Sequence, residues 1–128
     1  MPATRIDTRR GWIGERRLAV IEAVQRALQQ GLKIPDDDRC ISLAEHDADA
    51  MIVPRGKGPA YSVIEMKLFS GRSTEAKRRL YAAMTDELSA LGVPKHDIKI
   101  ILVEIDPVNW GLRGLPASDI DLGFKIDV

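Results

Sequence analysis

The sequence predicts an α/β (α+β) fold built from a duplicated β-α-β unit, in which two helices cover one face of a four-stranded mixed sheet. Three observations predict it. Strand-like and helical hydrophobic patterns alternate twice in the same order, and each helical stretch ends at a glycine followed shortly by a proline. The two helix-to-strand passages also superpose. When Ile34-Pro35 is laid over Val93-Pro94, Ile41 falls on Ile100 and Leu43 on Leu102, and the same shift places Tyr61 over Pro2.

The composition suits one globular domain spanning residues 1–128, because 45% of the residues are hydrophobic and 30% are charged. The 19 basic and 19 acidic residues cancel, so we expect neither nucleic acid nor a membrane surface as a partner. No apolar run reaches the roughly 20 residues of a membrane span. A single cysteine and an N-terminus without an apolar signal core favour a cytoplasmic location.

The first unit covers about residues 2–45. An extended piece over residues 2–8 precedes a break at two glycines, and a helix is predicted over residues 15–30. Its apolar stripe consists of Leu18, Ile21, Val24 and Leu28, which lie three and four residues apart. Gly31 is interpreted as the helix stop. A second strand is predicted over residues 40–45.

The second unit covers about residues 61–105 and repeats this order. Residues 61–69 alternate as a strand, and Ser73 is a suitable N-cap for the second helix. The buried stripe of that helix is predicted to be Ala76, Leu80, Ala83, Met84, Leu88 and Leu91. Residues 98–105 are apolar on both faces, which favours a central strand.

Each unit forms a right-handed crossover between parallel strands, so both helices lie on one face of the sheet. The other face then lacks a cover within one chain, and we expect an oligomer to bury it. Residues 46–60 form the main irregular loop. The tail over residues 106–128 ends in a short alternating run that we expect to pair with a neighbouring subunit.

Several short motifs, taken together, resemble a known family. The Met-Pro start, the duplicated unit and GRSTEAKRRL at the second helix look like the tautomerase superfamily, which includes 4-oxalocrotonate tautomerase and macrophage migration inhibitory factor. IPDDDR before a strand and VNW after the last strand are closer to the malonate semialdehyde decarboxylase-like branch. The resemblance implies a homotrimer, no cofactor, and an active site at a subunit boundary beside an N-terminal proline.

Pro2 is the candidate catalytic base. A proline carries a basic secondary amine only when it is the terminal residue, so the hypothesis requires that Met1 is removed. A terminal amine titrates at about 7.7–8.0 in the reference case, and burial favours its neutral form. Such an amine can take a proton from the carbon next to a carbonyl and return it elsewhere. The alternative is an ordinary second residue with no chemical role.

Arg72 is the candidate for holding a substrate carboxylate, the role that the resemblance gives to an arginine at this position. A guanidinium binds a carboxylate through two parallel hydrogen bonds and could also favour the neutral form of Pro2. The alternative is a solvated loop arginine. The decarboxylase pattern has a second arginine two positions earlier, where this chain has Ser70, and this difference favours tautomerisation over decarboxylation.

Three further residues complete the candidate site. The resemblance gives Asp38 a part in assisting substrate or water, although Asp36-Asp37-Asp38 also fits a capping turn and Asp97 occupies the equivalent place in the second unit. Trp110 is expected to line the pocket or to pack over the sheet end. Asn109 beside it could donate to a substrate oxygen, and Leu112 replaces a phenylalanine that is common in this branch.

The remaining reactive side chains are interpreted as structural. His46 and His96 stand too far from other ligands for a metal site, so we expect no metal. Cys40 is interpreted as a small core residue rather than a nucleophile.

Three functions remain open. The first is a cofactor-independent tautomerase acting on a small 2-oxo or 2-hydroxyalkenoic acid, with Pro2, Arg72 and Asp38 as catalytic candidates and Trp110 and Asn109 as substrate contacts. The second is a decarboxylase or hydratase on the same scaffold. The third is a non-catalytic trimeric binding protein that retains Met1.

Overall fold

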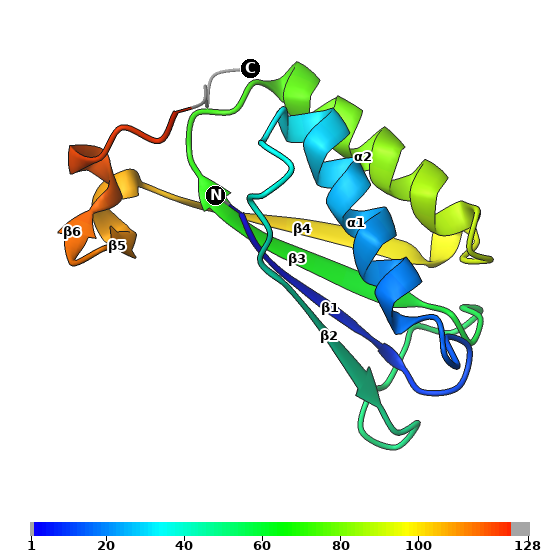
Figure 1. Cartoon of the computed structure of the whole chain (residues 1–128). Coiled ribbons are helices and arrows are strands. Elements are labelled where there is room, and N and C mark those ends of the chain that lie inside the picture. Colours follow the sequence, from blue (N-terminus) through cyan, green and yellow to red (C-terminus); the bar gives the residue numbers. More distant parts are fainter. Residues whose placement is uncertain (1, 124–128) are drawn as a thin grey trace.

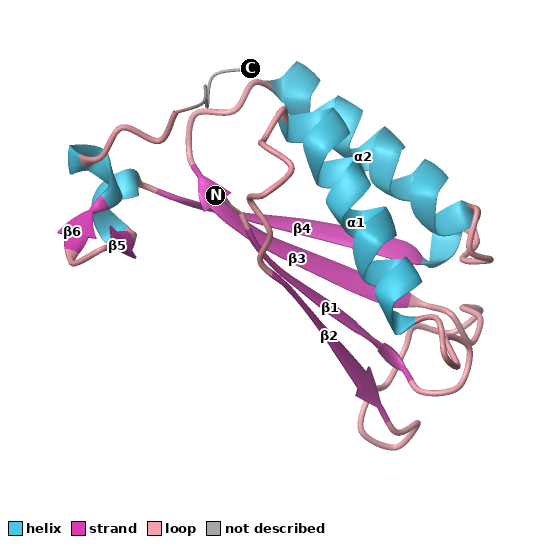
Figure 2. Ribbon diagram, viewed as in Figure 1, coloured by secondary structure: helices cyan, strands magenta, loops and turns pink. Residues whose placement is uncertain are grey.

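The structure, a computed structural model, describes residues 2–123 and consists of one layer of sheet under one layer of helices (Figures 1 and 2). The two helices are α1 (Arg17–Leu32) and α2 (Thr74–Ser89), and they lie side by side on the same face. The four strands are β1 (Ala3–Arg9), β2 (Ile41–His46), β3 (Ser62–Phe69) and β4 (Ile98–Ile105). The predicted four-stranded mixed sheet with two helices on one face is confirmed.

The strand order is β2-β1-β3-β4. β1 pairs parallel with β2, β3 pairs parallel with β4, and the two units meet through an antiparallel pairing of β1 with β3. Ile6 lies opposite Ile64 at the centre of that antiparallel pair. The start of β1 and the end of β3 therefore lie at the same end of the sheet, where these strands begin and finish.

The prediction that residues 98–105 form a central strand is wrong, because β4 is an outer strand. Its helix-side residues Ile100 and Leu102 pack against the core. Side chains alternate along a strand, so Ile101 and Val103 point to the other face, where they are 42% and 36% exposed. The second apolar face of β4 is thus the uncovered side of the sheet rather than a sign of a central position.

The predicted superposition of the two units is displaced by one residue in the first strand. Ile6 pairs with Leu43, and Met66 pairs with Leu102. Because Leu43 and Leu102 are equivalent, Met66 is the counterpart of Ile6, and Ser62 rather than Tyr61 stands over Pro2. The physical reason is the two-residue period of a strand: a shift by one residue would turn every core side chain to the opposite face.

Helix α1 ends later than predicted, because Gly31 lies inside it. A Cβ at Gly31 would stand 2.5 Å from the Leu80 Cα, so this glycine allows α1 and α2 to approach closely. Lys33, in the left-handed conformation at φ 57, ends the helix instead. Leu18 does not belong to the buried stripe, since it is 76% exposed.

Helix α2 follows its prediction more closely. Ser73 is its N-cap, and the Ser73 side chain accepts a hydrogen bond from the Ala76 backbone N–H at 3.0 Å. All of the predicted stripe is buried except Leu91, which lies beyond the helix end and is partly buried.

After β4 the chain forms a small hairpin of β5 (Gly111–Leu112) and β6 (Leu115–Pro116). Arg113 and Gly114 connect its strands with φ values of 54 and 80, the pattern of a two-residue hairpin turn. Short 3-10 helices cover Lys95–Asp97, Pro107–Asn109 and Ala117–Asp119. The end of the alternating tail, residues 124–128, lies outside the described residues. Within residues 2–123, no helix has both the length and the apolarity that crossing a bilayer demands.

Candidate active site

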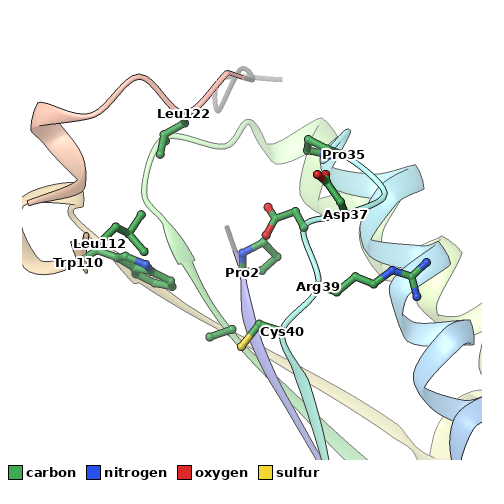
Figure 3. Close-up of a pocket in the computed structure, with 10 residues that line it drawn as sticks. Pro2, Pro35, Asp37, Arg39, Cys40, Trp110, Leu112 and Leu122 are labelled. Carbon is green, nitrogen blue, oxygen red and sulfur yellow. The ribbon is translucent and has the colours of Figure 1, made fainter. Parts of the chain in front are cut away.

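A cavity of about 410 Å³ opens at the edge of the sheet where β1 begins (Figure 3). This volume lies in the range of small-molecule sites. Three segments supply its walls: the start of β1, the turn before β2, and the region after β4. The lining residues are Pro2, Ala3, Pro35, Asp37, Asp38, Arg39, Cys40, Trp110, Leu112 and Leu122.

Pro2 lies in the middle of this cavity, between Trp110 on one side and Asp37 on the other (Figure 3). It is buried, and the β-sheet fixes its position. Thr4, two residues after Pro2, is hydrogen-bonded to the residue that precedes β2. Its backbone N–H donates to the Cys40 carbonyl at 2.9 Å. The first residues of β1 are therefore held rigidly against the turn before β2.

The turn before β2 forms an acidic wall. The Asp38 backbone N–H donates to the Pro35 carbonyl at 3.1 Å, which closes the turn. The Gln25 side chain of α1 donates to the Asp38 carbonyl at 3.2 Å and anchors the turn to the helix layer. Both Asp37 and Asp38 line the cavity, and Asp38 is half-buried.

Arg39 also lines the cavity, but its guanidinium is engaged elsewhere. It donates to the Glu22 carboxylate at 2.7 Å and to the Asp36 carboxylate at 3.0 Å. In Figure 3 its side chain runs away from Pro2 towards the helices. The cavity therefore faces the stem of Arg39 more than its charge.

The opposite wall is apolar. Trp110 packs edge-on against Phe69 of β3, with ring centroids 4.8 Å apart and an interplanar angle of 60°. Its carbonyl accepts a hydrogen bond from the Ala117 backbone N–H at 2.7 Å, which fixes the segment after β4. Leu112 and Leu122 complete this wall. Trp110 thus both lines the cavity and packs over the end of the sheet.

Arg72 does not line the cavity. It is 6% exposed, and its guanidinium donates to the Leu32 carbonyl at the end of α1. Burial lowers the pKa of Arg72, against the attraction of the Asp38 carboxylate, which raises it. The charges of Arg72 and Asp38 therefore attract each other, and the contact of Arg72 with α1 ties the two units together.

The candidate Asn109 and the replaced position Ser70 also stand outside the cavity lining. Asn109 is exposed in a 3-10 turn. The hydroxyl of Ser70, which occupies the place of the second arginine, donates to the Asp106 carboxylate at 2.8 Å. Ser70 thus provides a neutral link between the end of β3 and the segment after β4.

Asp97, the equivalent of Asp38 in the second unit, is buried and does not line an open cavity. It is 1% exposed, and its Oδ2 accepts the Gly58 backbone N–H at 3.1 Å. The loop before β3 therefore covers the position in the second unit that is equivalent to the cavity, so only Asp38 lines an open site.

Sequence reasoning missed the lining role of Asp37, Pro35, Cys40 and Leu122. Cys40 is exposed, so its interpretation as a core residue is wrong. The strand register could have predicted the place of Cys40. Cys40 immediately precedes Ile41, the residue that pairs with Thr4 near the start of β1. No pattern in the sequence places Leu122, which reaches the cavity through the fold of the tail.

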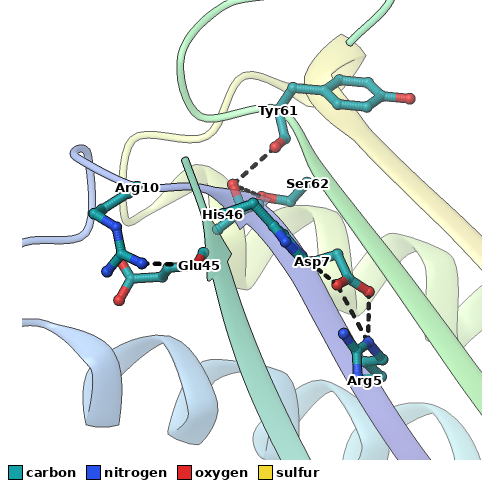
Figure 4. Close-up of polar contacts among 8 residues, drawn as sticks. Arg5, Asp7, Arg10, Glu45, His46, Tyr61 and Ser62 are labelled. Carbon is teal, nitrogen blue, oxygen red and sulfur yellow. Dashed lines mark hydrogen bonds and ion pairs between the residues drawn. The ribbon is translucent and has the colours of Figure 1, made fainter. Parts of the chain in front are cut away.

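A second polar cluster lies on the helix-free face of the sheet (Figure 4). His46 Nε2 and Asp7 Oδ1 are 2.7 Å apart, and the Arg5 guanidinium donates to the same carboxylate at 3.0 Å. Partial burial raises the pKa of Asp7, but the hydrogen bonds and charges of Arg5 and His46 outweigh it, so the pKa lies below its ordinary value. Within residues 2–123, no three potential metal ligands of the His, Cys, Asp and Glu type are grouped.

Comparison with known proteins identifies the family. A family described as "Tautomerase enzyme" matches residues 38–113, more than half of the chain. A probable tautomerase of Ralstonia nicotianae is 33% identical over 57 residues, which cover 44% of this chain and 81% of the relative. A probable tautomerase of Listeria innocua is 34% identical over 58 residues, 44% of this chain and 95% of the relative. The chain belongs to the tautomerase enzyme family, as the sequence motifs indicated.

Solved structures agree with the fold. A malonate semialdehyde decarboxylase called FG41, inhibited by 3-bromopropiolate, has a TM-score of 0.75 and 34% identity, covering 85% of this chain and 87% of that chain. A fused 4-OT symmetric trimer has a TM-score of 0.80 and 26% identity, covering 91% and 96%. The chain is therefore an enzyme of the tautomerase family, and its structural neighbours include malonate semialdehyde decarboxylase and fused 4-OT.

Proposed function

We propose that this protein is a cofactor-independent tautomerase that moves a proton on the carbon next to the carbonyl of a small 2-oxo acid. The observation that carries the proposal is the position of Pro2, buried at the centre of the cavity between an acidic and an apolar wall. Membership of the tautomerase enzyme family supports it.

The chemistry requires Pro2 as the terminal residue, with Met1 removed. The lone pair of the Pro2 amine then takes a proton from C3 of the substrate. The electrons of that C–H bond form a C2–C3 double bond, and the carbonyl electrons move onto oxygen, giving an enol or enolate. The ammonium of Pro2 returns the proton to carbon or oxygen. Burial of Pro2 favours the neutral amine that starts this cycle.

Asp38 and Trp110 are proposed to orient the substrate. Asp38 lines the cavity and is held by the turn and by the charge of Arg72. Trp110 offers a flat apolar surface for the carbon skeleton. Arg72 is proposed to act through Asp38 rather than on the substrate. Asn109 lies outside the cavity lining, so we assign it no contact in a single chain.

Two measurements test the proposal. The intact mass of the natively produced protein shows whether Met1 is removed, and a mass that includes Met1 would exclude Pro2 as the base. Deuterium incorporation at C3 of 2-oxohexanoate in D₂O, followed by NMR, measures proton transfer directly. Pro2→Ala should slow it by roughly 10²–10⁴-fold, whereas Pro59→Ala, in an exposed loop, should not.

A decarboxylase or hydratase is the second candidate. The 34% identity to a malonate semialdehyde decarboxylase and the position of Asp38 in the cavity favour it. The neutral Ser70 side chain weakens it, because no cation stands there. Release of CO₂ from malonate semialdehyde without deuterium exchange into 2-oxohexanoate would reverse our order of preference.

We also propose that the protein is a homotrimer. The helix-free face of the sheet is uncovered in one chain, and the fused 4-OT with 26% identity is a symmetric trimer. The cytoplasmic location stays a prediction from the sequence.

A further inference from the structure

Gln25 is the one polar side chain among the buried residues of α1 and α2, in the part of the chain that the structure describes. It is 1% exposed within a single chain, so its contacts do not depend on a neighbouring subunit. Its Oε1 accepts no hydrogen bond from residues 2–123. A buried amide is costly unless its donors and acceptors are paired. Core packing alone therefore does not account for an amide at this position.

The amide nitrogen of Gln25 holds the turn before β2. Its Nε2 donates to the Asp38 carbonyl at 3.2 Å. Only the nitrogen of an amide can donate to a carbonyl, and this fixes the orientation of the Gln25 side chain. Asp38 lines the cavity around Pro2. Since the carbonyl and the carboxylate of Asp38 share one Cα, a fixed carbonyl limits the directions that the carboxylate can take.

Helix α1 and strand β1 hold the next two residues of the turn. The Arg39 guanidinium donates to the carboxylate of Glu22, one helical turn before Gln25, at 2.7 Å. The Cys40 carbonyl accepts the backbone N–H of Thr4 in β1 at 2.9 Å. The ion pair between Arg39 and Glu22 is largely exposed and contributes little. The buried bond of Gln25 is therefore the firmer of the two contacts with α1.

Gln25 reaches the cavity only through this turn. It is not among the residues that line the cavity with Pro2. It lines a separate hollow of about 160 Å³ between α1 and β2, together with Ile21, Arg39 and Ile41. Without the bond from Gln25 the backbone at Asp38 can rotate, while Pro2 stays fixed at the start of β1. The relative position of the two groups would then change.

We infer that Gln25 is a positioning residue, which sets the place of Asp38 relative to Pro2 through the Asp38 carbonyl. The inference deepens the proposed function and rests on it, because Asp38 is proposed there to orient the substrate. A displacement of about 1 Å in an orienting group can slow a reaction by about 100-fold. Loss of the bond should thus lower turnover more than it lowers stability.

Gln25→Met removes the donor and nearly conserves the side-chain volume. It also removes the unpaired oxygen, so the melting temperature should stay close to that of the wild-type protein. In deuterium exchange at C3 of 2-oxohexanoate, kcat should fall about tenfold or more, with little change in KM. Gln30→Met is the matched control, because it makes the same substitution at an exposed position of α1. It should keep the wild-type kcat.

A double-mutant cycle provides a readout that a general structural effect would not produce. Asp38→Asn should itself lower kcat. If Gln25 acts through Asp38, adding Gln25→Met to Asp38→Asn should lower kcat by less than about twofold further. Independent effects would instead multiply. Gln25→Leu also lacks the donor and takes the place of Gln25→Met if circular dichroism shows that the latter is poorly folded.

The outcomes separate the inference from the proposed function. A coupled loss of kcat supports the inference. In an active wild-type protein, the inference alone is overturned if a folded Gln25→Met variant keeps its kcat, if only KM changes, if the two losses multiply, or if Asp38→Asn has no effect. Absence of exchange in the wild-type protein, or exchange that survives Pro2→Ala, refutes the proposed function and the inference with it.

Discussion

At the scale of single residues, Arg72 combines a structural contact with an electrostatic one. Its guanidinium is buried and bonded to the Leu32 carbonyl. Arg72→Met keeps much of the apolar stem but leaves that carbonyl without its donor. We expect the free energy of unfolding to fall by about 1–3 kcal/mol, measured by urea denaturation.

Arg26→Met is the control for Arg72→Met. Arg26 is exposed and pairs with Glu87 across the two helices, so its loss should cost less than about 1 kcal/mol. If Arg72→Met keeps wild-type stability but weakens the binding of 2-oxohexanoate, the guanidinium acts on the substrate and our placement of its role is wrong.

Asp7 gives a prediction about pH. Its pKa in the folded chain lies below the ordinary value because of Arg5 and His46, despite partial burial. The ionised carboxylate therefore stabilises the fold at a pH above the unfolded value of about 3.9, and this contribution is lost as the pH falls through the lower folded value. The difference in unfolding free energy between the wild-type protein and Asp7→Asn should be constant above about pH 5 and shrink below it.

Asp49→Asn serves as the comparison for Asp7→Asn, because Asp49 is an exposed carboxylate in the loop after β2. It should change stability little at any pH. A difference between wild type and Asp7→Asn that grows as the solution becomes more acidic would contradict the assigned direction of the pKa shift.

The candidate site was predictable from the sequence where a residue's place follows from the strand order. Pro2 directly precedes the first strand and Asp38 precedes the second, so a parallel pairing brings them to the same end of the sheet. Trp110 follows β4 at the same end. The direction of the Arg72 side chain, however, depends on where α1 ends relative to α2, and the placement of Leu122 depends on the path of the tail. Neither has a local pattern.

At the scale of elements, the contact between α1 and α2 depends on Gly31. A methyl group there would meet the Leu80 backbone at 2.5 Å, and backbone atoms cannot move aside as a side chain can. Gly31→Ala should raise helix propensity by about 1 kcal/mol yet lower overall stability by about 1–3 kcal/mol through overpacking. Thermal unfolding with Gln30→Ala, at an exposed position of the same helix, checks this.

A stabilised Gly31→Ala protein would mean that the helices separate at little cost. The interpretation of Gly31 as a helix stop is wrong in either case, because α1 continues to Leu32. That interpretation failed because a glycine near a helix end has the same local pattern whether it terminates the helix or permits a close contact. Only the neighbouring helix distinguishes the two cases, and the sequence does not specify which residue it presents.

At the scale of the whole molecule, the sequence predicted the sheet, the helix layer and the duplication, because hydrophobic period and chain punctuation repeat in both units. It did not predict the place of β4. A strand with apolar side chains on both faces is expected to be buried on both faces. The sequence does not specify whether the residues that bury it belong to the same chain or to another subunit. In this fold Ile101 and Val103 are left on the open face of an outer strand, which supports the proposed homotrimer.

The open face of the sheet is proposed to be the interface between subunits. Wild-type protein should elute in size-exclusion chromatography with light scattering at three times the mass of one chain. Val103→Asp puts a charge where an apolar interface is proposed, and we expect smaller species with loss of activity, because the cavity lies at the edge of the same sheet. Leu18→Asp is the matched control, since Leu18 is 76% exposed on the helix side. A trimer that survives Val103→Asp but not Leu18→Asp would place the interface on the helices and refute the packing of the sheets against one another.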